Sequence, residues 1–285
     1  MKKLCLLATL VSAAACGSVN SPTSPVPSGT SGVAVYSAVG ASDANGVGSS
    51  APCLPYTTCP EGKGYVQEIV RRLQASGKTV TLQNLGVPGA VLSSSIQTIA
   101  NQLNRGAAIN FIQDEAPFVR TDSTLVTVFA GGNDANTIGS AIKAGYGGSN
   151  ATAWANQQIA QFSADMLTLV KAIKTRAPNA RIVILNLPNL AAMPYSSGNT
   201  AQEKQILQQI SVGLNAGINA TASQGAIIVD MMCDSRLYSS SIFSSDGFHP
   251  NDTGYQLFAD LIYAVTPTTA STATPKSSCS YMSMY

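Results

Sequence analysis

The chain has 285 residues, a formal net charge of +2 and only 11% charged residues, compared with the ~25% usual for soluble domains. Polarity comes instead from Ser, Thr, Asn and Gln. No basic stripe or acidic run indicates a nucleic acid or a strongly charged polymer as partner. Beyond the N-terminal segment, about 250 residues remain, which is enough for one α/β domain with a large core.

The N-terminus predicts export. Residues 1–15 combine a positive start, a short apolar run and three closing alanines, which is the pattern of a signal peptide. The apolar run is far shorter than the ~20 residues of a membrane-spanning helix. Cys16 follows directly, and the stretch resembles a bacterial lipoprotein signal, which implies lipidation of Cys16 and a location in the outer membrane or at the cell surface. Periplasmic or extracellular secretion with a free Cys16 is the alternative.

Residues 16–31 are rich in Pro and Ser and predict a flexible linker. The four cysteines after Cys16 form an even set, as expected in an oxidising compartment. We expect the disulfides Cys53–Cys59 and Cys233–Cys279. By closing a loop in the unfolded chain, they should stabilise the folded state by about 2 and about 4 kcal/mol, respectively. The Ser/Thr-rich residues 266–285 would then be a C-terminal tail that is tied to the domain only through Cys279.

Short apolar runs alternate with longer helical patterns throughout residues 32–265. Val/Ile/Leu-rich runs separated by helices indicate parallel strands that are buried on both faces. The expected strands are residues 33–39, 79–85, 125–130, 182–187 and 226–231. The expected helices are residues 65–75, 94–104, 153–176, 201–222 and 253–265. Five such units predict a three-layer, doubly wound α/β domain, whose ligands bind at the carboxyl ends of the strands.

Small and polar residues follow the expected strands and should meet at that edge of the sheet. Ser42 follows the first strand, Gly89 the second and Asn133 the third. After the fifth strand comes His249, the only histidine, three residues beyond Asp246. An imidazole can take and return a proton near pH 7. Each residue alone also fits an ordinary turn or helix cap, so the convergence of the segments is the informative signal.

Together these segments resemble the SGNH/GDSL hydrolase family of serine esterases and lipases, over about residues 33–265. The resemblance implies a flavodoxin-like fold and hydrolysis of carboxylic esters through an acyl-enzyme intermediate. It implies the catalytic triad Ser42, Asp246 and His249, with an oxyanion hole formed by Ser42, Gly89 and Asn133. It requires no metal or organic cofactor. The expected partner is a small-molecule or polymer-borne ester, bound by a monomer.

The first motif of the site departs from the family pattern, and the choice of one oxyanion donor stays open. The first motif of the family usually reads Gly-Asp-Ser-Leu, whereas this chain reads Gly40-Ala41-Ser42-Asp43. The carboxylate before the serine is therefore missing, and the support around the nucleophile should differ. Gly86 lies in the same block as Gly89 and is the alternative oxyanion donor.

The sequence leaves the substrate open between short-chain esters, lipids and O-acetylated polysaccharides. Residues 49–64, which contain the short disulfide, and residues 137–155 are expected to wall the pocket. The second segment would bring Tyr146 and Trp154 to the substrate.

Three other classes of protein compete with this interpretation. Gly40-Ala41-Ser42 is close to the nucleophile elbow of α/β-hydrolases, but that elbow normally follows several strands. A metallohydrolase lacks ligands here, because the chain has one histidine and its cysteines are expected to be paired. A non-catalytic surface lipoprotein that binds glycan or lipid at the sheet edge is the third alternative.

Overall fold

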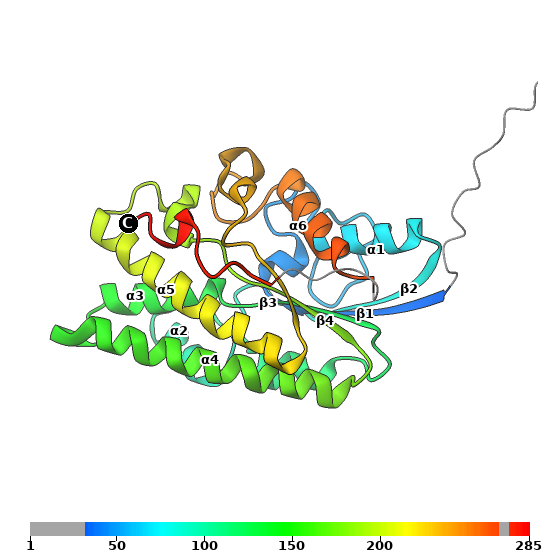
Figure 1. Ribbon diagram of the computed structural model, residues 1–285, viewed down its shortest axis with the longest axis horizontal. Coiled ribbons are helices and arrows are strands. Elements are labelled where there is room, and N and C mark those ends of the chain that lie inside the picture. The colour runs from blue at the N-terminus through cyan, green and yellow to red at the C-terminus, as the bar shows by residue number, and fades with distance from the viewer. Residues whose placement is uncertain (1–31, 268–273) are drawn as a thin grey trace, which may run out of the picture.

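A five-stranded parallel sheet forms the middle layer of the protein (Figure 1). The computed structural model describes residues 32–267 and 274–285, so the expected signal peptide, Cys16 and the linker lie outside the described residues. The strands are β1 (Gly32–Gly40), β2 (Lys78–Asn84), β3 (Leu125–Phe129), β4 (Arg181–Leu185) and β5 (Ile227–Val229). Their order is β2-β1-β3-β4-β5. The order reverses direction between β1 and β3, and this is where a doubly wound fold binds its ligands.

Helices cover both faces of the sheet, as predicted for the three-layer fold (Figure 1). The helices α1 (Tyr65–Ala75) and α6 (Asp252–Ala264) pack together on one face. The other face carries α2 (Ser94–Gln102), α3 (Gly132–Lys143), α4 (Ala151–Arg176) and α5 (Ala201–Ala220). No helix in the described part of the chain is both long and apolar enough to cross a bilayer.

The burial of each strand follows from its place in the sheet. The strands β3 and β4, which lie inside the sheet, read LVTVF and RIVIL and are buried almost throughout. The edge strand β2 reads KTVTLQN, and its burial alternates along most of its length. Strands covered on both faces carry continuous apolar runs, whereas a half-exposed strand alternates. The inner strands are apolar on both faces, so the sheet must be covered by helices on both sides and forms the middle layer.

The helix α3 is absent from the elements predicted above. Its sequence begins Gly132-Asn133-Asp134 and contains Gly139, and glycine disfavours a helix by about 1 kcal/mol per residue. The helix nevertheless buries Ala135, Ile138 and Ala141 at a spacing of three residues. Burial of this stripe outweighs the poor helix propensity, and it places Asn133 in the first helical turn.

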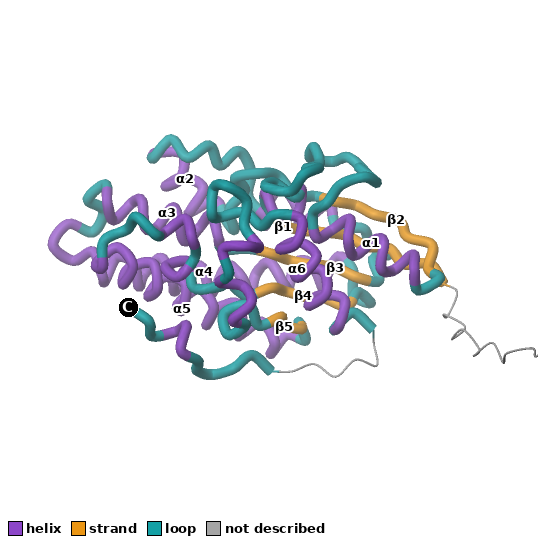
Figure 2. The backbone as a smooth tube through the Cα atoms, turned by 90° about the horizontal axis from the view of Figure 1, so that it is seen from above, coloured by secondary structure: helices purple, strands orange, loops and turns teal. Residues whose placement is uncertain are grey.

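Both expected disulfides, Cys53–Cys59 and Cys233–Cys279, are present in the structure. The prediction that Cys279 alone holds the C-terminal tail is wrong. Residues 274–285 run beside β5 and α5 (Figure 2), and the side chain of Gln208 accepts hydrogen bonds from the backbone N–H groups of Met284 (2.7 Å) and Tyr285 (3.1 Å). The sequence could not reveal this, since Gln208 lies far from the tail along the chain.

Candidate active site

A chain of hydrogen bonds connects the three residues predicted as the triad. The Nδ1 atom of His249 lies 2.6 Å from Oδ2 of Asp246, and Nε2 lies 2.9 Å from Oγ of Ser42. With Nδ1–H donating to the carboxylate, Nε2 is left as the acceptor for the serine hydroxyl. In this tautomer, the ring has the position that proton removal from Ser42 requires.

The loop after β5 fixes the carboxylate of Asp246. Its Oδ1 atom accepts the backbone N–H groups of Phe248 (2.8 Å) and His249 (2.9 Å) and the hydroxyl of Ser244 (2.9 Å). Partial burial acts to raise the pKa of Asp246, but the His249 ring and these donors stabilise the anion more strongly and lower the pKa to about 2. The group is thus a carboxylate at neutral pH.

The approach of the histidine loop to the Ser42 turn depends on Gly48. A Cβ atom at this position would lie 2.7 Å from the carbonyl oxygen of Pro250 and 2.8 Å from Cβ of His249. Gly48 also has φ +93°, a conformation that other residues rarely adopt. Because Gly48 has no side chain, two loops that are far apart in the sequence can pack against each other.

Two asparagine side chains hold the turn that carries Ser42. Ser42 begins a single 3₁₀ turn, Ser42–Asn45, directly after β1. Within it, Asn45 Nδ2 donates to the carbonyl oxygen of Gly86 at 2.7 Å. From the end of β2, Asn84 Nδ2 donates to the carbonyl oxygen of Ala44, also at 2.7 Å. The serine is therefore held on a rigid turn beside the neighbouring strand.

A buried carboxyl group that the sequence analysis missed supports the same turn. Glu115 ends the short π-helical segment Phe111–Glu115 and is 0% exposed. Its Oε2 atom accepts the N–H of Gly40 at 2.9 Å, two residues before the nucleophile. Burial raises the pKa of Glu115 well above its usual value, against the opposing effect of the Gly40 hydrogen bond. Nothing in the sequence marks Glu115 as buried, because its partner is a backbone N–H.

Of the expected oxyanion-hole residues, Ser42 begins this turn and Asn133 lines the same pocket as Ser42. The N–H groups of Ser42 and Gly89 form no hydrogen bond with the described part of the chain, and Gly89 has φ +82°. The N–H of Gly86, in contrast, already donates to Oδ1 of Asn84 at 3.1 Å. Gly86 is therefore less suited than Gly89 to donate to a substrate. The side chain of Asn133 donates to the carbonyl oxygen of Ala90 at 2.9 Å, which leaves its second amide hydrogen for another acceptor.

Ser42 and Asn133 line one pocket, whose space of about 620 Å³ includes open solvent. The rest of the lining is mainly apolar and comes from the ends of several strands, with Ala90, Phe111, Phe129, Leu187, Pro188, Leu190, Met193, Leu237, Phe243, Phe248 and Phe258. Asp43 adds a carboxyl group to the lining, and burial raises its pKa, against the charge of His249.

The segments that were expected to wall the pocket do not line it. Residues 49–64 and 137–155 contribute no side chain to the lining. Gly89 does not line the pocket either, although the next residue, Ala90, does. Tyr146 instead donates to Gln102 at 2.9 Å and packs against Trp154, with the ring centroids 5.5 Å apart. These aromatic side chains complete the packing around α3 and α4, a role that sequence alone cannot distinguish from substrate binding.

The sequence profile of the GDSL-like lipase/acylhydrolase family matches residues 38–257. The chain therefore belongs to this family of hydrolases. No curated protein matches the chain.

Solved structures share the fold at low sequence identity. Phospholipase A1 from Streptomyces albidoflavus NA297 is 18% identical, with a TM-score of 0.51 over 80% of this chain and 98% of that chain. A lipase from a goat rumen metagenome is 16% identical, with a TM-score of 0.54 over 81% and 97%. An acetyl xylan esterase from Geobacillus stearothermophilus is 13% identical, with a TM-score of 0.52 over 85% and 98%. The five-stranded parallel α/β fold of this chain thus matches that of SGNH hydrolases.

Proposed function

We propose that the protein hydrolyses carboxylic esters that carry an apolar acyl group, with Ser42 as the nucleophile. One observation carries the proposal, namely the hydrogen-bond chain from Ser42 through His249 to Asp246 beside a pocket with a mainly apolar lining. An apolar pocket favours an acyl chain, because each buried methylene contributes about 0.8 kcal/mol. The substrate class is therefore the esters of fatty or shorter alkanoic acids.

In the proposed reaction, His249 Nε2 takes the proton of Ser42 as the serine oxygen attacks the ester carbonyl. The carboxylate of Asp246 stabilises the imidazolium that forms. The N–H groups of Ser42 and Gly89 and the amide of Asn133 donate to the oxyanion. The imidazolium then gives its proton to the leaving alcohol. Water, activated by the same imidazole, attacks the acyl-enzyme and releases the acid.

The test is hydrolysis of nitrophenyl esters with acyl chains of two to sixteen carbons, together with acetate release from acetylated xylan. We expect the highest kcat/KM for an acyl chain longer than acetyl and no xylan deacetylation. Ser42→Ala and His249→Ala should abolish the activity, whereas Ser277→Ala, at an exposed serine of the tail, should leave it unchanged. Xylan as the better substrate would assign the protein as a carbohydrate O-deacetylase.

A fluorophosphonate probe separates the enzyme from the non-catalytic binding protein considered above. We expect the probe to label Ser42 in the folded wild-type protein and to leave His249→Ala unlabelled, since the hydroxyl then lacks its base. No labelling of the wild type, alongside a reactive control esterase, would favour the binding protein.

We further propose that the protein is exported and anchored through lipidated Cys16. The signal-like N-terminus and the even set of later cysteines support this proposal. Mass spectrometry of the mature N-terminus tests it, and Cys16→Ser should move the protein from the membrane fraction to the soluble fraction. A mature N-terminal peptide with an unmodified Cys16 thiol would instead indicate ordinary secretion.

A further inference from the structure

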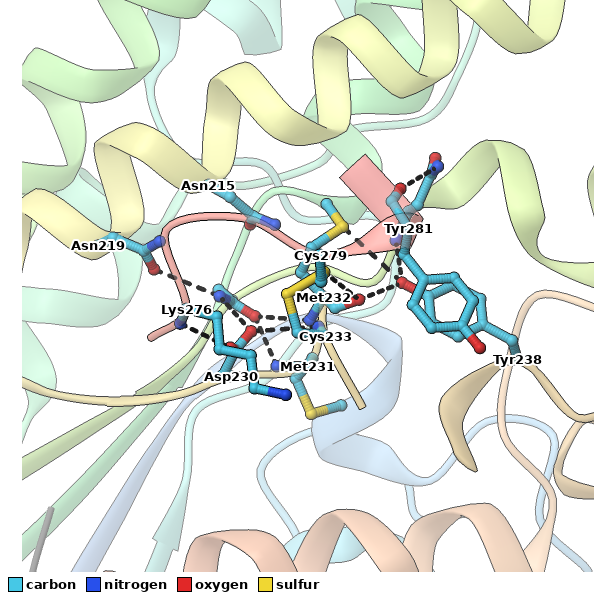
Figure 3. The surroundings of a disulfide bond; sticks show 12 residues. Asn215, Asn219, Asp230, Met231, Met232, Cys233, Tyr238, Lys276, Cys279 and Tyr281 are labelled. Carbon is cyan, nitrogen blue, oxygen red and sulfur yellow. Dashed lines mark hydrogen bonds between the residues drawn. A yellow bond between two sulfur atoms is a disulfide. The ribbon is translucent and has the colours of Figure 1, made fainter. Parts of the chain in front are cut away.

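Residues 274–285 form a segment that we call the C-terminal strap. The disulfide Cys233–Cys279 joins it to the loop that follows β5 (Figure 3). Upstream of the disulfide, the N–H of Lys276 donates to Oδ2 of Asp230 at 3.0 Å. The strap therefore lies against the carboxyl end of β5, on the edge of the sheet that carries the proposed active site.

Beyond the disulfide, a stacked tyrosine pair connects the strap to two loops. The rings of Tyr281 and Tyr238 are nearly parallel, with an interplanar angle of 8° and centroids 3.8 Å apart (Figure 3). The hydroxyl of Tyr238 accepts the N–H of Asn189 at 2.9 Å and donates to the carbonyl oxygen of Met232 at 2.7 Å. The side chain of Asn189 donates in turn to the carbonyl oxygen of Tyr281 at 2.7 Å. The strap thus contacts the loop that follows β4, which carries Asn189, and the loop that follows β5, which carries Cys233 and Tyr238; we call them the β4 loop and the β5 loop.

The same two loops supply one wall of the pocket. Leu237 directly precedes Tyr238, and Pro188 and Leu190 flank Asn189 on either side; all three apolar residues line the pocket. Asn189 is 0% exposed, so the donor of its hydrogen bond to the strap is buried and would be costly to leave unpaired. The position of this wall therefore depends on the strap.

The wall lies far from the nucleophile along the sheet. Ser42 follows β1, while the wall residues follow β4 and β5, which are two and three strands away in the sheet order. Neighbouring strands are ~4.8 Å apart, which places the strand ends about 10 and about 14 Å from the end of β1. At this spacing, we expect a long acyl chain on Ser42 to reach the wall and an acetyl group to stop short of it.

We propose that the C-terminal strap, through Tyr281 and the disulfide Cys233–Cys279, determines the preference of the enzyme for acyl-chain length. The proposal rests on the esterase function proposed above. It assigns Tyr281 as a positioning residue, because its ring acts on the pocket through Tyr238 and Asn189. Ser42 lies on another loop, and Asp246 and His249 lie farther along the β5 loop than the residues bonded to the strap. Release of the strap should therefore change the discrimination between substrates and leave the chemistry intact.

The experiment compares kcat/KM for nitrophenyl dodecanoate and nitrophenyl acetate in matched pairs of variants. Tyr281→Ala removes the stacked ring, and Tyr281→Phe keeps it. The double variant Cys233→Ser, Cys279→Ser releases the strap, and Cys53→Ser, Cys59→Ser removes the other disulfide as its control. In Tyr281→Ala and the strap-released variant, we expect the dodecanoate-to-acetate ratio to fall about tenfold, which corresponds to lost contact with about two methylenes. The two controls should keep the wild-type ratio.

The outcomes separate this proposal from the function on which it rests. If the wild type hydrolyses neither ester, the proposed function fails. If it hydrolyses both, and release of the strap leaves the ratio unchanged or lowers both rates equally, the strap does not set specificity. Fluorophosphonate labelling of Ser42 at the wild-type rate shows that each variant has kept its fold and triad. A ratio that falls with labelling retained supports the proposal.

Discussion

At the scale of single residues, the site depends on hydrogen bonds that fix charge and tautomer. Asp246 uses one oxygen for the histidine ring and the other for three donors of its own loop. The lowered pKa of about 2 means that ionised Asp246 stabilises the folded state above its unfolded pKa of ~3.9. This contribution is lost as the pH falls through 2.

Replacement of Asp246 by Asn should lower kcat by about 10²–10⁴-fold, because the amide can hold the imidazole in the wrong tautomer. The backbone donors can still bond to the amide oxygen, so the fold should persist. Stopped-flow kinetics with a short-chain ester measure the loss, and circular dichroism controls for unfolding. Activity within tenfold of the wild type in a folded Asp246→Asn protein would contradict the assigned role.

Asn133 gives the second prediction at this scale. Asn133→Ala removes one oxyanion donor, so kcat should fall by about 10²–10³-fold with little change in KM, because this interaction strengthens only in the transition state. Asn136→Ala, one turn further along α3 and outside the pocket lining, is the control. An increase in KM alone would make Asn133 a ground-state binding residue.

At the scale of secondary-structure elements, the end of β1 depends on a carboxyl group from a distant segment. Glu115 binds the N–H of Gly40, and the sequence motif before the serine lacks the carboxylate that the resemblance leads one to expect. Glu115 belongs to a different element, the segment Phe111–Glu115, and its hydrogen bond holds the backbone that leads into the Ser42 turn. Burial raises the pKa of this carboxyl group, which favours its neutral form.

Glu115→Gln should therefore be tolerated, because the amide oxygen can still accept the Gly40 N–H without a charge. Glu115→Ala leaves that N–H buried and unpaired, at a cost of about 1–3 kcal/mol, and should also lower kcat by displacing the turn. Urea denaturation and ester kinetics on both variants test this. Equal stability and kcat for the Ala and Gln variants would show that Glu115 does not support the nucleophile.

The elements themselves were largely predictable, because apolar runs on both sides of short turns identify buried parallel strands. The five strands and the helices α1, α2, α4, α5 and α6 appear near the predicted bounds. The helix α3 was not predicted, since two glycines conceal a helix that tertiary burial stabilises. For the site, motifs place Ser42, Asp246 and His249 on loops that the structure brings together.

What the sequence could not provide are contacts made through the backbone or across the fold. The anchoring by Glu115, the pocket wall around Leu237 and the bonds of the tail to Gln208 all join segments that are far apart in the chain. No local pattern encodes such contacts, because each depends on how complete elements pack. The segments that were chosen as pocket walls lie next to site residues in sequence and point elsewhere in space.

At the scale of the whole molecule, a buried acid links folding stability to pH. Asp134 is 1% exposed and accepts the N–H of Leu92 at 3.0 Å. Burial raises its pKa to about 7; the Leu92 and Asp134 backbone N–H groups oppose the shift, and the charge of Asp165 adds to it. Between the unfolded pKa of ~3.9 and the folded value, the folded state holds a proton that the unfolded state has lost.

Stability should therefore fall as the pH rises from 4 to 7, by no more than about 4 kcal/mol from this group. Asp134→Asn keeps the acceptor for Leu92 and cannot ionise, so its stability should change less over this range. Urea midpoints of both proteins at pH 4.5 and pH 7.5 measure the difference. Parallel pH dependence in the two proteins would show that another group is responsible.

The separation of the site residues along the chain also governs when activity can begin. Ser42 and His249 are 207 positions apart, so the ribosome makes the proposed nucleophile long before its proposed base. A chain still under synthesis carries a serine that has no proton acceptor within reach. If the protein is the proposed esterase, ester cleavage can start only after the loop that carries His249 has reached Ser42, and enzymatic turnover would then report on folding of the domain.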